Sequence, residues 1–160
     1  MIVLLMGPAG SGKTTVGKLL ASQLHWEFSD ADAFHSRANI QKMSRGIGLT
    51  DEDRLPWLQS IRDAILEWQS QGRNVVLACS ALKRSYREFL GIGSNVKLVY
   101  LKGDDELLRE RLRSRKEHYA GQRLLASQLA DLEEPDDAIA LSAAAPPEET
   151  ASEICKCLGL

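Results

Sequence analysis

A glycine-rich segment near the start of the chain holds the residues best suited to chemistry. It reads Gly7-Pro8-Ala9-Gly10-Ser11-Gly12-Lys13-Thr14 and fits the pattern G-x-x-x-x-G-K-[ST] at every fixed position. The glycines allow a tight turn in which successive backbone N–H groups point into one concavity that can bind phosphate. Lys13 is expected to reach the β- and γ-phosphates, and the Thr14 hydroxyl is expected to bind Mg²⁺. The predicted nucleotide-binding residues are Gly7, Pro8, Ala9, Gly10, Ser11, Gly12, Lys13, Thr14 and Thr15.

The alternative interpretation of this segment is a glycine-rich turn with an incidental lysine, and its surroundings argue against that. The apolar run Ile2–Met6 precedes it, and apolar residues at helical spacing follow it, namely Val16, Leu19, Leu20 and Leu24. A strand before the loop and a helix after it are what this mode of phosphate binding requires. Binding of ATP or GTP is therefore predicted.

A pair of carboxylates, Asp30 and Asp32, follows the second predicted strand. Ligands of parallel α/β sheets bind at the carboxyl ends of the strands, and residues two apart on an extended segment share one face. One carboxylate can help to hold Mg²⁺, and the other can accept a proton from, or orient, an attacking alcohol. We assign the metal role to Asp30, together with Thr14, and the alcohol role to Asp32. Aspartates are also common in solvated turns, but beside a phosphate-binding loop the functional interpretation is favoured.

The elements that position these groups alternate between short β-rich runs and longer helical patterns. Strands are expected at Ile2–Met6, Glu27–Asp30, Asn74–Ser80, Val96–Lys102 and Ala138–Ser142. The longest helix is expected to begin at Thr50, where Thr50-Asp51-Glu52-Asp53 resembles a capping box. Such alternation predicts an α/β fold with a mostly parallel five-stranded sheet and helices on both faces. Residues 1–160 are expected to form one domain.

Composition limits the classes of protein that remain. The 160 residues carry a formal net charge of −2, which does not favour binding to nucleic acid or to an acidic membrane surface. The apolar runs are too short for a signal peptide or a membrane span, so a cytoplasmic location is expected. The three cysteines, Cys79, Cys155 and Cys157, are expected to be reduced packing residues rather than metal ligands.

Among P-loop proteins, a GTPase switch needs Asp-x-x-Gly and Asn-Lys-x-Asp, and neither pattern occurs in the sequence. The third predicted strand also lacks the terminal Asp of a usual Walker B site. A small-molecule kinase is therefore favoured, and a non-catalytic nucleotide-binding module is the alternative from a different class. Shikimate kinase is the other candidate enzyme, although the sequence contains no Gly-Gly pair and so lacks the glycine triplet typical of that family.

Three further segments resemble the gluconate kinase family. Residues 30–43 read DADAFHSRANIQKM and are similar to the family pattern D-x-D-x-x-H-x-x-x-N-x-x-K-M. Residues 48–58 (GLTDEDRLPWL) and 79–87 (CSALKRSYR) are similar to two more family segments, and Ser127-Gln128 adds to the match. The resemblance covers the chain almost from end to end. The chain departs from the family at Glu117, where glycine is usual, and at Leu129, where phenylalanine is usual.

This resemblance implies an ATP- and Mg²⁺-dependent enzyme with the P-loop fold of adenylate and shikimate kinases. The enzyme would transfer the γ-phosphoryl group of ATP to the 6-hydroxyl of D-gluconate, giving 6-phospho-D-gluconate and ADP. It also implies a homodimer. An acceptor-binding region is expected at about residues 30–60, and a lid at about residues 111–130.

The resemblance also suggests roles for several side chains. Asp32 would act on the acceptor hydroxyl, and His35 would hydrogen-bond a sugar hydroxyl. The substrate carboxylate would be bound by cations drawn from a pool that includes Arg37, Arg54 and Lys83. Arg54 is the first choice because it lies in the first turn of the longest helix, which is expected to form a wall of the acceptor pocket. In the lid, Arg111 and Arg115 are one helical turn apart and would close over the phosphates.

Overall fold

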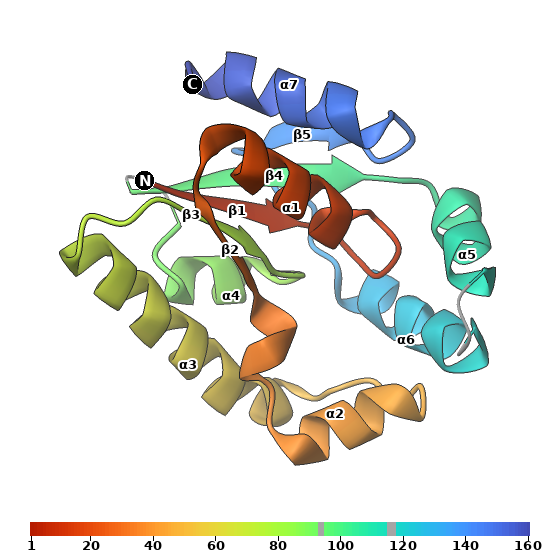
Figure 1. Ribbon diagram of the computed structural model, residues 1–160. Helices are drawn as coiled ribbons and strands as arrows, with labels where there is room; N and C mark the ends of the chain where they lie inside the picture. The colour runs from red at the N-terminus through yellow and green to blue at the C-terminus, as the bar shows by residue number, and fades with distance from the viewer. Residues whose placement is uncertain (93–94, 115–117) are drawn as a thin grey trace.

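The computed structural model describes residues 1–92, 95–114 and 118–160, and of residues 118–120 the backbone alone. Strands and helices alternate along the chain (Figure 1). The strands are β1 (Ile2–Met6), β2 (Glu27–Asp30), β3 (Val75–Ala78), β4 (Val96–Lys102) and β5 (Ile139–Ser142). The helices are α1 (Lys13–Leu24), the 3-10 turn η1 (Ala31–Phe34), α2 (Arg37–Ser44), α3 (Asp51–Ser70), α4 (Arg84–Phe89), α5 (Asp105–Arg113), α6 (His118–Asp131) and α7 (Pro147–Leu158).

The five strands form one sheet in the order β2-β3-β1-β4-β5, and each pair of neighbours is parallel. The α/β fold class predicted from the sequence is therefore confirmed. β3 is shorter than the predicted run of residues 74–80, because its partner β2 ends at Asp30, which lies opposite Ala78. β5 begins one residue later than predicted, at Ile139, the first residue paired with β4.

Helices cover both faces of the sheet because the side chains of each strand alternate between them. In β1, Val3 and Leu5 pack with α1 and α7 on one face, whereas Ile2, Leu4 and Met6 pack with α3 and α4 on the other. All five residues of β1 are fully buried, which is why the strand reads as a continuous apolar run. Figure 1 shows α1 and α7 lying together over one side of the strands.

The predicted start of the longest helix is confirmed at Thr50. The Thr50 hydroxyl accepts a hydrogen bond from Asp53 N, and the Asp53 carboxylate accepts one from Thr50 N, which together form a capping box. Lys42 donates to the same carboxylate, and these bonds hold the pKa of Asp53 down at about 2. None of the helices in the described part of the chain combines the length and apolar character that crossing a bilayer requires.

The carboxyl ends of the strands carry the features predicted to do chemistry. The glycine-rich loop connects β1 to α1, and η1 follows β2 directly. Helices α5 and α6 pack against each other at this end of the molecule, where Leu108, Leu112 and Leu125 form a small apolar cluster against Ala9 of the loop. The fold thus brings the loop, the aspartates and the expected lid region to one edge of the sheet.

Candidate active site

A pocket lies at this edge, and its wall includes Lys13, Thr14, Asp30, Asp32, His35 and Arg54. These residues come from α1, β2, η1, the segment after η1, and α3. Six residues predicted from the sequence for three different tasks, namely phosphate, metal and acceptor binding, therefore share one cavity. Trp57, Ala78 and Gln128 also line it.

The glycine-rich loop has the conformation that a phosphate site needs. Gly10 and Gly12 have φ angles of 84° and 92°, a region that residues with a Cβ rarely adopt. Gly12 caps the N-terminus of α1. The N–H groups in the first turn of a helix have no partner within the helix, so a helix end of this kind can bind an anion. The Lys13 ammonium donates a hydrogen bond to the Pro8 carbonyl at 3.0 Å, which holds the side chain against the loop.

Thr14 and Asp30 form a pair of oxygen ligands suited to Mg²⁺. The Thr14 hydroxyl donates to Asp30 Oδ2 at 3.3 Å, and Asp30 Oδ1 accepts from Asp32 N at 3.0 Å. The described residues contain no cluster of three or more His, Cys, Asp or Glu residues that could hold a metal alone. That arrangement fits Mg²⁺ in a nucleotide site, since this ion uses one or two protein carboxylates, substrate phosphates and water.

Asp32 lies in the same pocket with an altered acidity. Its partial burial raises the pKa of the carboxyl above the ordinary value, and the neighbouring Asp30 carboxylate raises it further. Lys13 opposes both effects, because a cation favours the ionised form. A carboxylate with a raised pKa is a stronger base than an ordinary aspartate, which suits a group that accepts a proton from an alcohol.

His35 and Trp57 form a stacked wall of the pocket, with ring centroids 4.3 Å apart and planes inclined by 10°. The Trp57 indole N–H donates to the Ala31 carbonyl at 2.8 Å, which fixes the ring beside η1. Burial and the positive charge of Arg54 lower the pKa of His35 to about 4. The imidazole is therefore neutral at physiological pH and can exchange hydrogen bonds with sugar hydroxyls.

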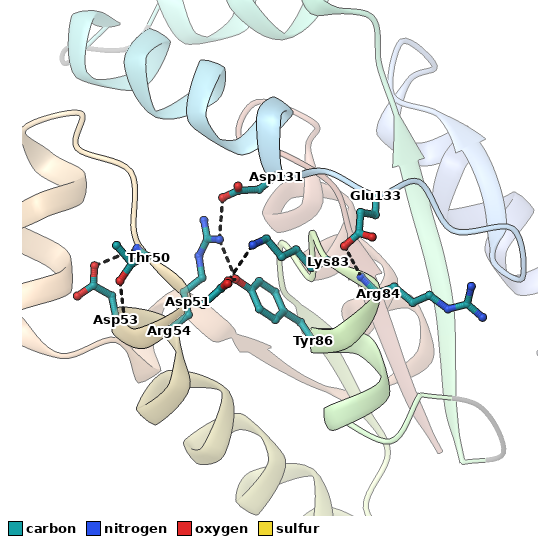
Figure 2. A network of polar contacts seen from close by, with 9 residues as sticks. All are labelled: Thr50, Asp51, Asp53, Arg54, Lys83, Arg84, Tyr86, Asp131 and Glu133. Carbon is teal, nitrogen blue, oxygen red and sulfur yellow. Dashed lines mark hydrogen bonds and ion pairs between the residues drawn. The ribbon is translucent and has the colours of Figure 1, made fainter.

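Arg54 is a buried cation with only 5% of its surface exposed. Its Nη1 donates to the Tyr86 hydroxyl at 3.0 Å and to Asp131 Oδ2 at 2.8 Å (Figure 2). Burial lowers the pKa of the guanidinium, but these two partners outweigh it, so the pKa is raised overall. Within the described residues, Nε and Nη2 donate no hydrogen bond, and the residue lines the pocket. Arg54 thus keeps donors for an anionic ligand.

Three of the other predicted cations, Arg37, Lys83 and Arg111, do not line this pocket. Lys83 is paired with Asp51 at 2.9 Å, and Asp51 also accepts a hydrogen bond from Tyr86 (Figure 2). Arg37 is exposed in the first turn of α2. Arg111 donates to the carbonyls of Gly10, at 3.1 Å, and Ala143. Arg115 lies outside the described residues.

A second pocket also borders the glycine-rich loop, and Asp32 is not part of its wall. Gly12, Thr15, Arg111, Ala143, Ala145 and Pro147 line it. Ala143 and Ala145 belong to the segment that connects β5 to α7, and Pro147 is the first residue of α7. The two pockets share Gly10, Gly12 and Thr15, so both border the loop and the first turn of α1.

Sequence reasoning gave no site role to Gln128 or Asp131. Gln128 lines the pocket that contains Asp32 and Arg54, and it accepts a hydrogen bond from Ala9 N at 2.7 Å. The Ser127-Gln128 pair was a signal for it, since it belongs to the resemblance described above. Asp131 carried no local signal, because its partner Arg54 lies 77 residues earlier in the chain.

The parallel sheet, the glycine-rich loop and the adjoining aspartates define a P-loop phosphotransferase. A family model described as an AAA domain matches residues 2–135. The chain is 43% identical to a probable gluconokinase of Mus musculus, over 84% of this chain and 83% of the relative. It is 44% identical to the thermoresistant gluconokinase of Escherichia coli (strain K12), over 84% and 77% of the two chains.

A solved structure agrees with these relatives. The gluconokinase from Sinorhizobium meliloti 1021 superposes with a TM-score of 0.82 at 36% identity, over 98% of this chain and 94% of that one. The chain belongs to the gluconokinase family. The expectation drawn from the resemblance is confirmed at the level of the family.

Proposed function

We propose that the enzyme transfers the γ-phosphoryl group of ATP to the 6-hydroxyl of D-gluconate, giving 6-phospho-D-gluconate and ADP. The observation that carries the proposal is the shared pocket, whose wall includes residues of the phosphate loop, Asp32 and the buried cation Arg54. A substrate with a hydroxyl at one end and a carboxylate at the other suits that set of groups.

The reacting groups follow from this arrangement. Asp32 accepts the proton of the 6-hydroxyl while the oxygen forms its bond to the γ-phosphorus. The bond from the γ-phosphorus to the bridging oxygen breaks, and ADP leaves. Lys13 and the N–H groups of the loop stabilise the charge on the transferring oxygens. Mg²⁺, held by Thr14 and Asp30, would neutralise phosphate charge when bound.

The acceptor is held at its other end by Arg54, whose open N–H groups suit a carboxylate. His35 hydrogen-bonds a hydroxyl of the chain between them. Arg111 is proposed to act on the phosphates, and its bond to the Gly10 carbonyl supports this by holding it beside the loop. The roles of Arg115, Arg37 and Lys83 stay predictions. A cytoplasmic location and a homodimeric state also stay predictions.

A screen of acceptors tests the proposal. ADP release is measured with D-gluconate, D-glucose, shikimate and AMP under the same conditions. D-Gluconate is expected to give a kcat/KM far above the others, because a neutral sugar offers no carboxylate to the Nε and Nη2 donors that Arg54 keeps beside its bonds to Asp131 and Tyr86. Turnover with shikimate but not gluconate would support the shikimate-type alternative. The absence of turnover with any alcohol, despite ATP binding, would support a non-catalytic nucleotide-binding module.

A further inference from the structure

Helix α6 contacts both the phosphate loop and Arg54, the proposed ligand of the substrate carboxylate, through two polar side chains. Near its C-terminus, Gln128 Oε1 accepts the N–H of Ala9 at 2.7 Å. Ala9 precedes the positive-φ glycines Gly10 and Gly12 that shape the phosphate concavity. The bond to Gln128 therefore attaches α6 to the phosphate loop without using the N–H groups at the start of α1.

Three residues later, Asp131 holds the cation proposed to bind the substrate carboxylate. Its Oδ2 accepts from Arg54 Nη1 at 2.8 Å (Figure 2). The Arg54 side chain is almost fully buried. Residues three apart share one face of a helix and are about 4.5 Å apart along its axis. One face of α6 thus bonds to the phosphate loop and to Arg54.

Close packing behind this face leaves the helix little room to shift. A Cβ placed on Gly48 would lie 2.0 Å from the Ser127 hydroxyl oxygen, so the loop before α3 lies directly against α6. α3 begins at Asp51 and carries Arg54. The contact between Gly48 and Ser127 therefore holds the start of α3 against α6, in addition to the bond between Arg54 and Asp131.

We propose that Gln128 and Asp131 are positioning residues that fix the distance between the phosphate loop and Arg54, and so select acceptors by the length between hydroxyl and carboxylate. This inference rests on the proposed function. Transfer requires the hydroxyl oxygen close to, and in line with, the γ-phosphorus. If the phosphate loop and Arg54 are fixed to one helix, an acid one carbon shorter cannot reach both, and one that is longer must buckle.

The test compares three aldonates, the five-carbon D-xylonate, the six-carbon D-gluconate and the seven-carbon D-glucoheptonate, with the variants Q128M and D131N. Met keeps the size of Gln128 but cannot accept the N–H of Ala9, and Asn keeps the shape of Asp131 without its charge. The matched control is Q122M, because Gln122 is a half-buried residue of the same helix that lines neither pocket in the described structure. ADP binding and Tm are measured for each protein.

The wild-type enzyme is expected to prefer D-gluconate over both other acids by about tenfold or more in kcat/KM. In Q128M and D131N this preference should fall by about fivefold or more, mainly through kcat for D-gluconate, with ADP affinity within about twofold of wild type. Q122M should keep the wild-type preference. D131N is also expected to keep or lower KM for D-gluconate, because Arg54 loses a competing carboxylate.

A purely structural role predicts a different result. In that case Q128M and D131N would lower Tm and reduce kcat/KM by the same factor for all three acids, and the inference would be overturned. Wild-type activity with no preference among the three lengths would overturn it as well. Failure of the wild-type enzyme to phosphorylate any aldonate would instead overturn the proposed function, and the inference with it.

Discussion

At the scale of single residues, the proposed reaction depends on Lys13 and Asp32, two groups of opposite charge that line one pocket. Lys13 lowers the pKa of Asp32, while burial and Asp30 raise it by more. The pocket therefore contains both the cation proposed to stabilise phosphoryl charge and a carboxyl of raised pKa, the proposed base. Substitution of each group should affect a different property of the enzyme.

Lys13→Ala is expected to leave a folded protein in which phosphoryl transfer is nearly lost. Lys13 lies beside the loop and adds little to the core, so the free energy of unfolding should change by less than about 1 kcal/mol. Loss of charge stabilisation should lower kcat by about a hundredfold or more. The matched control is Lys18→Ala, an exposed lysine of the same helix. A Lys13→Ala enzyme with more than about a tenth of the wild-type kcat would contradict this assignment.

Asp32→Asn is expected to lower kcat steeply with little change in ATP affinity, since the amide has the same size but accepts no proton. The variant should also have a higher Tm at neutral pH. The folded-state pKa of Asp32 is raised, so its ionised form is disfavoured in the fold and lowers stability above that pKa; the gain should vanish as pH falls below it. An unchanged kcat in Asp32→Asn would contradict its role as the base. If Asp30→Asn instead loses kcat steeply while ATP binding stays intact, the roles of the two aspartates would be exchanged.

In the wild-type enzyme, the decrease in kcat toward low pH should follow protonation of the Asp32 carboxylate. His35 does not contribute above its pKa of about 4, because its imidazole is neutral there. A pH profile of kcat measures this.

Arg54→Lys is expected to raise KM for D-gluconate by about tenfold or more while leaving KM for ATP unchanged. One ammonium cannot hold Asp131 and a substrate carboxylate in the paired geometry that a guanidinium provides. The advantage of gluconate over glucose should narrow in the same variant. Arg62→Lys is the control, because Arg62 is exposed on the same helix and does not line the pocket. Equal effects of the two substitutions would argue against Arg54 as the carboxylate ligand.

At the scale of elements, the caps of α3 determine where Arg54 lies. Thr50→Ala removes the hydroxyl that accepts the Asp53 N–H, and should lower the free energy of unfolding by about 1 kcal/mol. Ser60→Ala, on an exposed part of the same helix, should change it by less than about 0.5 kcal/mol. Chemical denaturation measures both. A larger loss for Ser60→Ala than for Thr50→Ala would show that the capping box does not hold the start of the helix.

The elements themselves were largely predictable, for local reasons. The buried run Ile2–Met6 and the glycine-rich loop after it carry their pattern within a dozen residues, and the Thr50 cap lies within four. The strand ends were less predictable, because β3 stops where its partner β2 stops. The bonds Gln128–Ala9 and Arg54–Asp131 join residues 119 and 77 positions apart, and spacing along the chain cannot reveal them.

The same contrast between local pattern and distant contacts explains which predicted cations line the pocket. Arg54 was favoured for its place at the start of α3, and it does line the pocket. Lys83 follows β3 at the carboxyl ends of the strands, where the pocket lies, yet its ammonium forms an ion pair with Asp51. The choice between an ion pair and an open cation depends on tertiary neighbours, and composition alone does not determine it.

At the scale of the whole molecule, parallel strands bring every reacting group to one edge, and α6 connects the two sides of that edge. The phosphate loop follows β1, Asp30 and Asp32 follow β2, and Arg54 comes from the helix that covers one face of the sheet. We propose that this arrangement moves a phosphoryl group onto the end of a sugar acid opposite its carboxylate.

The most direct measurement of that claim couples the product to 6-phosphogluconate dehydrogenase and follows NADPH. With ATP, Mg²⁺ and D-gluconate, we expect a steady NADPH signal that depends on all three and is nearly lost in Lys13→Ala. The dehydrogenase acts on 6-phospho-D-gluconate, so the signal reports the position of the phosphate as well as its transfer. No NADPH with D-gluconate, alongside clear ADP release with a different alcohol, would contradict the account.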